Sequence, residues 1–139
     1  MFIDASAIVA ILNSEAGWED IVRRIEDHKE PHFVSPLVRF EASVALARSR
    51  SGQQSMPSAE QISIAEQSVD QFCQIIQARD VTITSKTGKL ALNAAKTYGK
   101  IVGHDAALNF GDCFTYGCAA SLECKIVYKG NDFAKTDMR

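Results

Sequence analysis

Short apolar runs alternate with amphipathic helical stretches along this chain, and this alternation limits the folds that it can adopt. Runs rich in apolar and β-branched residues predict strands at residues 2–4, 32–34, 81–84 and 125–128. Apolar residues spaced by three and four predict helices at residues 5–12, 15–28, 36–50, 57–77, 86–98 and 109–122. Strands that alternate with helices predict a mostly parallel sheet flanked by helices, which is an α/β fold.

Serine, proline and glycine mark the boundaries of several of these elements. Ser35 can cap the helix at 36–50, and Pro36 lies in its first turn, where a missing backbone N–H costs nothing. The polar link 51–56 separates this helix from the next one, so we expect the two to pack as a hairpin. Gly99 supplies a stop for the helix at 86–98.

Length and charge restrict the possible functions. With 139 residues, 46% of them hydrophobic, the chain can bury one core, so we expect a single domain over residues 1–139. The formal net charge of −2 argues against a broadly basic nucleic-acid-binding surface, so any contact with nucleic acid should be local. The four cysteines lack CxxC spacing and lie mostly among apolar or small residues, which favours a structural role.

The sequence also predicts a cytoplasmic protein without a membrane partner. Its first thirty residues do not have the basic start, apolar middle and small-residue cleavage site of a secretory signal. No apolar run approaches the roughly 18 residues of a membrane span.

Asp4 is the first candidate site residue, because it follows the strand at 2–4 where the chain enters a helix. The carboxyl ends of parallel strands are the places where such sheets build their sites. Asp4 can equally be a helix N-cap, since Asp is among the preferred capping residues. Ser6 can hydrogen-bond the Asp4 carboxylate or a nearby water, or satisfy backbone groups in the first helical turn.

Glu41 is the second candidate, because it shares a helix face with Leu37, Val44 and Ala45. We expect that face to point inward, where an ionised glutamate is costly unless it is paired or coordinates a metal. An ion pair with Arg39 or Arg48 is the alternative, but neither lies three or four residues from Glu41. The pattern therefore favours a site.

Asp112 and Asp132 complete the acidic set. Asp112 lies three residues after Asn109 in the first turn of the last helix, where the helix dipole alone favours an acid. Small neighbours such as Gly111 allow close approach to the sheet, so we expect Asp112 beside Asp4. Asp132 follows Asn131 after a strand, a pair that an ordinary Asx-turn would also use.

Several carboxylates with few other reactive groups are typical of divalent-metal catalysis. Mg²⁺ and Mn²⁺ prefer oxygen ligands, and in two-metal sites the ions activate a water and stabilise the leaving oxygen of a phosphodiester. The chain has no Walker A motif, no Gly-x-Ser-x-Gly elbow and no dinucleotide-binding glycine loop. The acidic residues therefore predict a Mg²⁺- or Mn²⁺-dependent hydrolase.

A set of short motifs runs along the whole chain: Phe-Ile-Asp-Ala-Ser-Ala at residues 2–7, Glu41, Leu-Asn-Phe-Gly-Asp-Cys at 108–113, Lys-Gly-Asn-Asp-Phe at 129–133 and Thr-Asp at 136–137. With these motifs the chain resembles PIN-domain ribonucleases, closely the VapC-type toxins of bacterial type II toxin–antitoxin pairs. The resemblance implies a three-layer, Rossmann-like α/β/α sandwich with a mainly parallel sheet, forming one PIN-like nuclease domain.

The resemblance also implies roles for the acidic residues. Asp4, Glu41 and Asp112 would be the core acids of the metal site, with Asp4 and Asp112 as direct Mg²⁺ ligands. We predict that Glu41 orients a metal-bound water or a second ion and that Asp132 assists. Residue 131 is often acidic in similar toxins but is Asn here. The sequence therefore leaves open whether the site has a fourth carboxylate and whether it binds a second metal ion.

The same resemblance implies the substrate and the partners. It implies cleavage of single-stranded or looped RNA, often a tRNA, together with a homodimer and neutralisation by a cognate VapB-type antitoxin that packs across the active site. Candidate phosphate contacts are Arg39, Lys86 and Lys89, but the sequence does not fix the substrate-binding residues.

Two alternative functions are left open. A phosphatase with Asp4 as nucleophile would want a second aspartate two residues later, where this chain has Ser6. A catalytically silent PIN-like interaction module would keep the fold for binding, and Asn131 is the feature that favours it.

Overall fold

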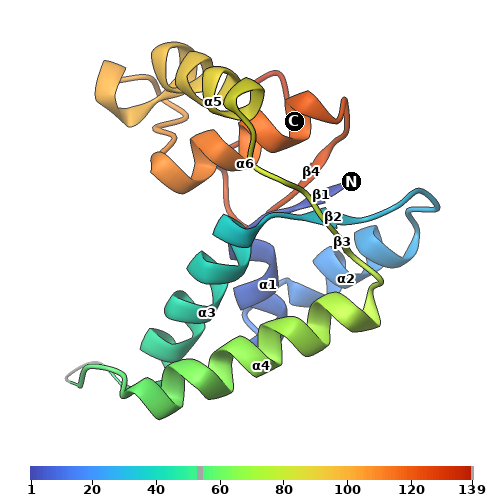
Figure 1. Ribbon diagram of the computed structural model, residues 1–139, viewed down its shortest axis with the longest axis vertical. Coiled ribbons are helices and arrows are strands. Elements are labelled where there is room, and N and C mark those ends of the chain that lie inside the picture. Colours follow the sequence, from blue (N-terminus) through green and yellow to red (C-terminus); the bar gives the residue numbers. More distant parts are fainter. Residues whose placement is uncertain (53–54, 139) are drawn as a thin grey trace.

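A computed structural model describes residues 1–52 and 55–138, and its sheet lies at the centre of the molecule (Figure 1). Within the described residues the sheet has four short strands, β1 (Phe2–Ile3), β2 (Phe33–Val34), β3 (Arg79–Asp80) and β4 (Ile126–Val127). All pairings are parallel and the order is β3-β2-β1-β4. Phe2 is in register with Phe33 on one side and with Ile126 on the other.

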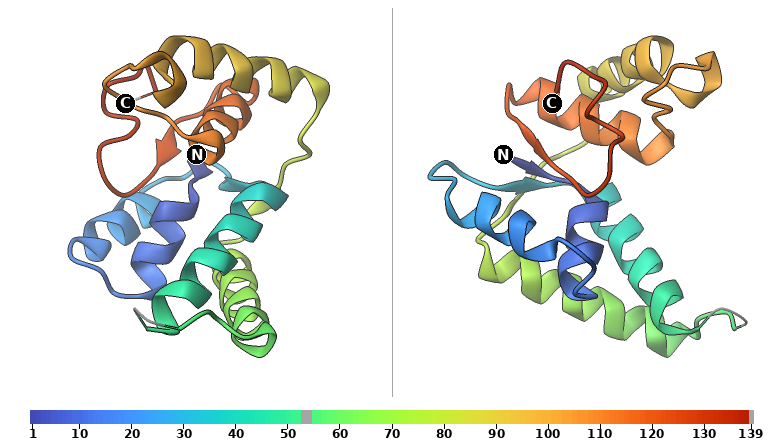
Figure 2. Two further views of the ribbon diagram at one scale, coloured as in Figure 1. Left: turned by 90° about the vertical axis from the view of Figure 1, so that its left-hand side faces the viewer. Right: turned by 180° about the vertical axis from the view of Figure 1, so that it is seen from behind.

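Helices cover both faces of the sheet, which confirms the predicted three-layer α/β/α sandwich (Figures 1 and 2). One face carries α1 (Ala5–Leu12), α2 (Trp18–Glu26), α3 (Pro36–Arg50) and α4 (Ala59–Ile75). The other carries α5 (Ser85–Tyr98), the short 3₁₀ helix η1 (Lys100–Val102) and α6 (Phe110–Ser121). No helix in the described part of the chain combines the length and hydrophobicity that crossing a bilayer requires.

The core explains why the strands are apolar rather than alternating. Phe2 and Ile3 are fully buried, and so are Val34 and Val127 in the neighbouring strands. Because helices lie on both faces, side chains pointing either way from a parallel strand meet apolar neighbours. Cys73, Cys113 and Cys118 are buried free thiols and Cys124 is partly buried.

The connections along the chain reverse the direction of the strand order at β1. From β1 the chain passes through α1 and α2 to β2, and then through α3 and α4 to β3 on the same side of β1. It then crosses to the other face through α5 and α6 and returns to β4, on the opposite side of β1. The strand order therefore reverses at β1, and ligand sites in open parallel sheets lie at such reversals.

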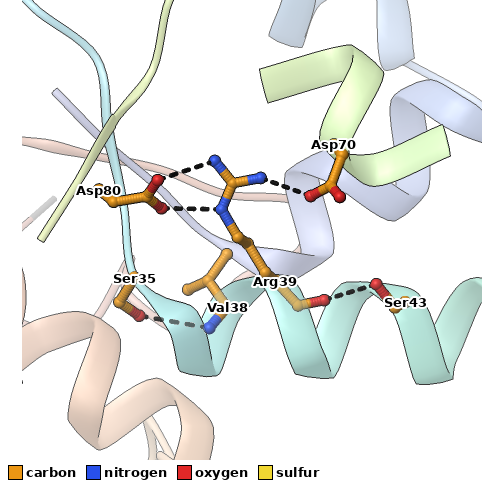
Figure 3. Close-up of polar contacts among 6 residues, drawn as sticks. All are labelled: Ser35, Val38, Arg39, Ser43, Asp70 and Asp80. Carbon is orange, nitrogen blue, oxygen red and sulfur yellow. Dashed lines mark hydrogen bonds and ion pairs between the residues drawn. The ribbon is translucent and has the colours of Figure 1, made fainter. Parts of the chain in front are cut away.

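Arg39 ties α3 to α4 and to the end of β3 (Figure 3). Its Nη1 donates to Asp70 Oδ1 at 2.8 Å, and its Nε donates to Asp80 Oδ1 at 2.8 Å. The hairpin predicted for these helices is confirmed, since α3 packs against α4. The guanidinium is engaged in these ion pairs, which argues against the phosphate contact suggested for Arg39.

Several predicted boundaries were wrong. The third strand is Arg79–Asp80, not 81–84, because the chain leaves the sheet after Val81 N–H bonds Val34 O and crosses to the opposite face to begin α5. Thr84 is needed there as the N-cap of α5. The second helix begins at Trp18 and the fourth at Ala59, where Ser58 forms a capping box with Gln61. Part of the predicted link 51–56 lies outside the described residues.

Candidate active site at the reversal of the sheet

Asp4 is held at the end of β1 by hydrogen bonds to both of its carboxylate oxygens. Oδ2 accepts from the Ser6 backbone N–H at 2.9 Å and from Ser6 Oγ at 2.5 Å. Oδ1 accepts from Thr115 Oγ1 at 2.8 Å. Asp4 is thus the N-cap of α1, as its capping interpretation predicted, but its carboxylate also faces α6 on the other side of the sheet.

Ser6 extends this network to the end of β4. Its Oγ accepts a hydrogen bond from the Lys129 backbone N–H at 3.0 Å while its own proton goes to Asp4. The segments after β1 and β4 are therefore joined through a single hydroxyl. This confirms the contact between Ser6 and the Asp4 carboxylate that the sequence suggested.

Asp112 lies in the first turn of α6, where it forms a capping box with Asn109. Its Oδ2 accepts from the Asn109 backbone N–H at 2.8 Å, and its own N–H donates to Asn109 Oδ1 at 3.0 Å. The pKa of the Asp112 carboxyl is raised from 3.8 to about 6, chiefly by burial; the hydrogen bond from the Asn109 backbone lowers it, and the charges of Asp4 and Asp132 raise it. Asp112 therefore caps α6 and also lies near Asp4.

Glu41 reaches the same site from α3, but not from a face that points into the core. The buried face of α3 is Val38, Ala42, Ser43, Leu46 and Ala47. The Glu41 face with Leu37, Val44 and Ala45 is partly exposed, so the prediction that it points inward was wrong. Burial raises the pKa of Glu41, and the charges of Asp4 and then Asp112 add to the effect.

Gly111 makes room for the Glu41 carboxylate. A Cβ on Gly111 would lie 2.3 Å from Glu41 Oε2 and 2.6 Å from Oε1, well inside contact distance. Any side chain at residue 111 would thus displace the glutamate from its place beside the first turn of α6. Gly111, next to Asp112, thus leaves the space that the Glu41 carboxylate from α3 occupies.

Asp132 and Asn131 lie in the segment after β4 and are exposed. The charge of Asp132 acts on Asp112, which places it at the rim of the acidic cluster. The cluster, defined as Asp4, Glu41, Asp112 and Asp132, thus joins side chains from four separate segments of the chain. Within the described residues none of the four forms an ion pair with a lysine or arginine.

The chemistry of this donor set fits a hard divalent cation. All the donors are carboxylate oxygens, and in the described part of the chain no lysine or arginine pairs with them to offset their mutual repulsion. Gly111 leaves space at Glu41. Among residues 1–52 and 55–138 no group of three or more His, Cys, Asp or Glu side chains is arranged so that it could hold a metal ion. Mg²⁺ does not require such a group, because it keeps several waters and binds through one or two carboxylates.

A groove leads to the cluster between α3 and α6. The cavity has a volume of about 660 Å³ and contains Glu41, Gly111, Asn109 and Arg48 with apolar side chains of both helices. Phe40 and Phe110 line it and are 67% and 70% exposed. Two exposed aromatic side chains in the same groove as the partly buried Glu41 indicate a surface made for binding.

Sequence reasoning did not identify three contributors to this site. Thr115 gave no signal beyond its spacing of three from Asp112, and its partner Asp4 is 111 positions away in the chain. Phe40 and Phe110 are ordinary apolar residues in a helical pattern until the structure shows them exposed.

Comparison with known proteins agrees with this fold. A family model described as the PIN domain matches residues 1–138. The chain is 48% identical over 139 residues to a VapC ribonuclease of Rhizobium meliloti, covering 99% of this chain and 98% of the relative. It is 30% identical over 142 residues to Ribonuclease VapC28 of Mycobacterium tuberculosis, covering 100% and 96% of the two chains.

The chain belongs to the PIN-domain family, since the matching family model spans nearly all of it. Its full-length similarity is to the VapC ribonucleases of that family. The resemblance drawn from the short motifs is therefore confirmed.

Proposed function

We propose that this protein is a Mg²⁺- or Mn²⁺-dependent endoribonuclease toxin that hydrolyses phosphodiester bonds in single-stranded or looped RNA. The observation that carries the proposal is the acidic cluster at the reversal of the sheet, in which buried Asp4 and Asp112 have no protein cation beside them within the described residues. Its similarity to VapC ribonucleases supports the same activity.

Each acid has a distinct role in this proposal. Asp4 and Asp112 hold the cation, which when bound supplies a Lewis acid that activates water and stabilises the leaving oxygen. Glu41 orients the attacking water and accepts its proton at Oε, a task favoured by its raised pKa. Asp132 assists from the rim, and Asn131 leaves the occupancy of a second cation site undecided.

The groove supports an RNA with unpaired bases as the substrate. Bases of a single strand stack on exposed aromatic side chains, and Phe40 and Phe110 offer such surfaces beside Glu41. Arg48 lines the same groove, where it can meet a phosphate. A tRNA loop is one substrate of this form.

The proposal includes the regulation implied by the VapC relationship. A cognate VapB-type antitoxin would neutralise the toxin in the cytoplasm by covering the groove with an apolar segment, and the toxin would act as a homodimer. The apolar side chains beside Glu41 support such a contact.

A cleavage assay tests the function. Purified protein is incubated with end-labelled total tRNA and a structured mRNA in Mg²⁺, Mn²⁺ or EDTA, beside Asp4→Asn and the control Asp80→Asn. Asp80 also ends a parallel strand, but it pairs with Arg39. We expect discrete fragments that require metal, disappear with Asp4→Asn and persist with Asp80→Asn.

The alternatives give different results in the same assay. A silent interaction module would cleave no RNA although folded and free of antitoxin. A phosphatase would form a trappable phosphoaspartate at Asp4, but the residue two positions later, Ser6, has its hydroxyl proton directed at Asp4 Oδ2. That geometry leaves the position without a general acid, which favours the nuclease.

A further inference from the structure

A hydrogen bond from Thr115 joins α6 to Asp4, which lies 111 positions earlier in the chain. Thr115 Oγ1 donates to Asp4 Oδ1 at 2.8 Å, and both residues are buried, with 1% of Thr115 and 4% of Asp4 exposed. No buried side-chain oxygen or nitrogen in the described residues lacks a partner. The threonine hydroxyl has a single proton, so this bond commits it to the Asp4 carboxylate.

Because Thr115 lies on α6, its bond to Asp4 links the end of β1 to the helix that carries Asp112. Thr115 lies three residues after Asp112, so the two side chains project from the same side of the helix. One hydrogen bond thus couples the end of β1, which carries Asp4, to the helix that carries Asp112. Two ionised carboxylates repel each other, and this bond opposes their separation.

The bond also leaves Asp4 able to bind a cation. A carboxylate oxygen has two lone pairs, so Oδ1 can accept from Thr115 and still bind a metal ion. Ser6 occupies Oδ2 from the opposite side, and together the two hydroxyls fix the plane of the carboxylate. Residues that orient metal-binding carboxylates in this way affect metal affinity without touching the metal.

We propose that Thr115 is a positioning residue, which sets the orientation of Asp4 and its spacing from Asp112 for divalent-cation binding. This inference rests on the proposed metal-dependent function. Thr115 does not contact the RNA in this proposal, because it is buried beneath the cluster.

The test compares Thr115→Val, which keeps the shape of the side chain and removes the hydroxyl, with Thr115→Ser, which keeps the hydroxyl. Mn²⁺ binding is measured by the loss of the EPR signal of free Mn²⁺, with circular dichroism to confirm folding. We expect Thr115→Val to weaken Mn²⁺ binding about 10- to 100-fold, and Thr115→Ser to retain most of the affinity. With RNA, kcat should fall for Thr115→Val while KM stays unchanged.

Other outcomes would overturn the inference in distinguishable ways. Wild-type affinity in Thr115→Val, or an equal loss in the valine and serine variants, would mean that the hydroxyl does not position Asp4. Lower stability with unchanged Mn²⁺ affinity would show a merely structural hydrogen bond. If wild-type protein binds no Mn²⁺, or binds it equally after Asp4→Asn, the metal-dependent function itself fails. If Thr115→Val does not fold, Thr115→Ala removes the same hydroxyl with a good helix former.

Discussion

Asp4 and Asp80 occupy equivalent places in the sheet but have opposite surroundings. Each is at the carboxyl end of a parallel strand, β1 for Asp4 and β3 for Asp80. Asp80 lies at the edge of the sheet, half exposed, and is paired with Arg39. Asp4 is buried at the point where the strand order reverses, and it has other acids beside it.

The same contrast appears along α3, which contributes a residue to each region. Arg39 forms ion pairs with Asp70 and Asp80 on one side of the helix, whereas Glu41, two residues later, adds a third acid to Asp4 and Asp112. The acids near Arg39 are paired with a cation of the protein, whereas those near Glu41 are the ones proposed to bind a cation from solution. Position relative to the strand reversal, rather than residue type, separates the two regions.

The largest effect is expected from Gly111→Ala. The added Cβ would displace the Glu41 carboxylate, and misplacement of a catalytic group by about 1 Å can cost about 100-fold in rate. Stability should be unchanged or slightly higher, since Ala favours a helix over Gly by about 1 kcal/mol. Cleavage rates and urea unfolding measure the two effects.

Gly117→Ala is the matched control in the same helix. There a Cβ would lie 2.8 Å from Thr87 O and 2.9 Å from Ala91 N in α5, so the helices must separate. We expect a loss of about 1–3 kcal/mol in the free energy of unfolding, the usual cost of overpacking, with cleavage per folded molecule retained. Loss of stability in Gly111→Ala with full activity would contradict the role given to Glu41.

The pH dependence of cation binding follows from Asp112. A carboxyl must lose its proton to bind a metal ion, and the pKa of Asp112 is raised to about 6. Mn²⁺ affinity should therefore fall as the pH drops through 6, by about tenfold per pH unit below it. Calorimetric titrations at several pH values would measure this, and an affinity independent of pH across that range would exclude Asp112 as a ligand.

Without metal, Asp112→Asn should stabilise the protein at neutral pH. The carboxyl has a pKa raised from 3.8 to about 6 in the folded state, so its contribution to stability is full below 3.8 and is lost as pH rises through 6. In EDTA at neutral pH we expect a gain of about 1–2 kcal/mol in the free energy of unfolding, which disappears in acid. A variant less stable than wild type at neutral pH would show that Asp112 is chiefly a capping residue.

The smallest effect is expected from Arg39→Gln on the paired side of α3. Its two partners are about half exposed, and such ion pairs contribute about 1 kcal/mol or less each. The free energy of unfolding should fall by about 1 kcal/mol, while cleavage per folded molecule stays constant. A specific loss of activity would show that Arg39 acts on substrate after all.

The fold was predictable because its signals are local. Short apolar strands, helical spacing and caps such as Ser35 are read from neighbouring residues, and they predict the layers and the parallel sheet. The position of β3 was missed because β-branched residues continue past Asp80, where the chain has already left the sheet. The strand propensity of the residues does not show where the chain crosses from one face of the sheet to the other.

The candidate site was predictable only in its acids. Asp4 and Asp112 follow from their places at element ends, but Glu41 was assigned to an inward face when its carboxylate instead borders a groove. Pairings between distant positions, such as Arg39 with Asp80 or Thr115 with Asp4, leave no local pattern. These pairings decide which strand-end aspartate is free for a cation.

Thermal unfolding with and without Mn²⁺ tests most directly whether the acidic cluster forms the cation site. Wild type, Asp112→Asn and Asp80→Asn are each melted in EDTA and in excess Mn²⁺, because a cation that binds only the folded state raises Tm. The account predicts a clear rise for wild type and Asp80→Asn and none for Asp112→Asn. No rise in wild type, or an equal rise in Asp112→Asn, would contradict it.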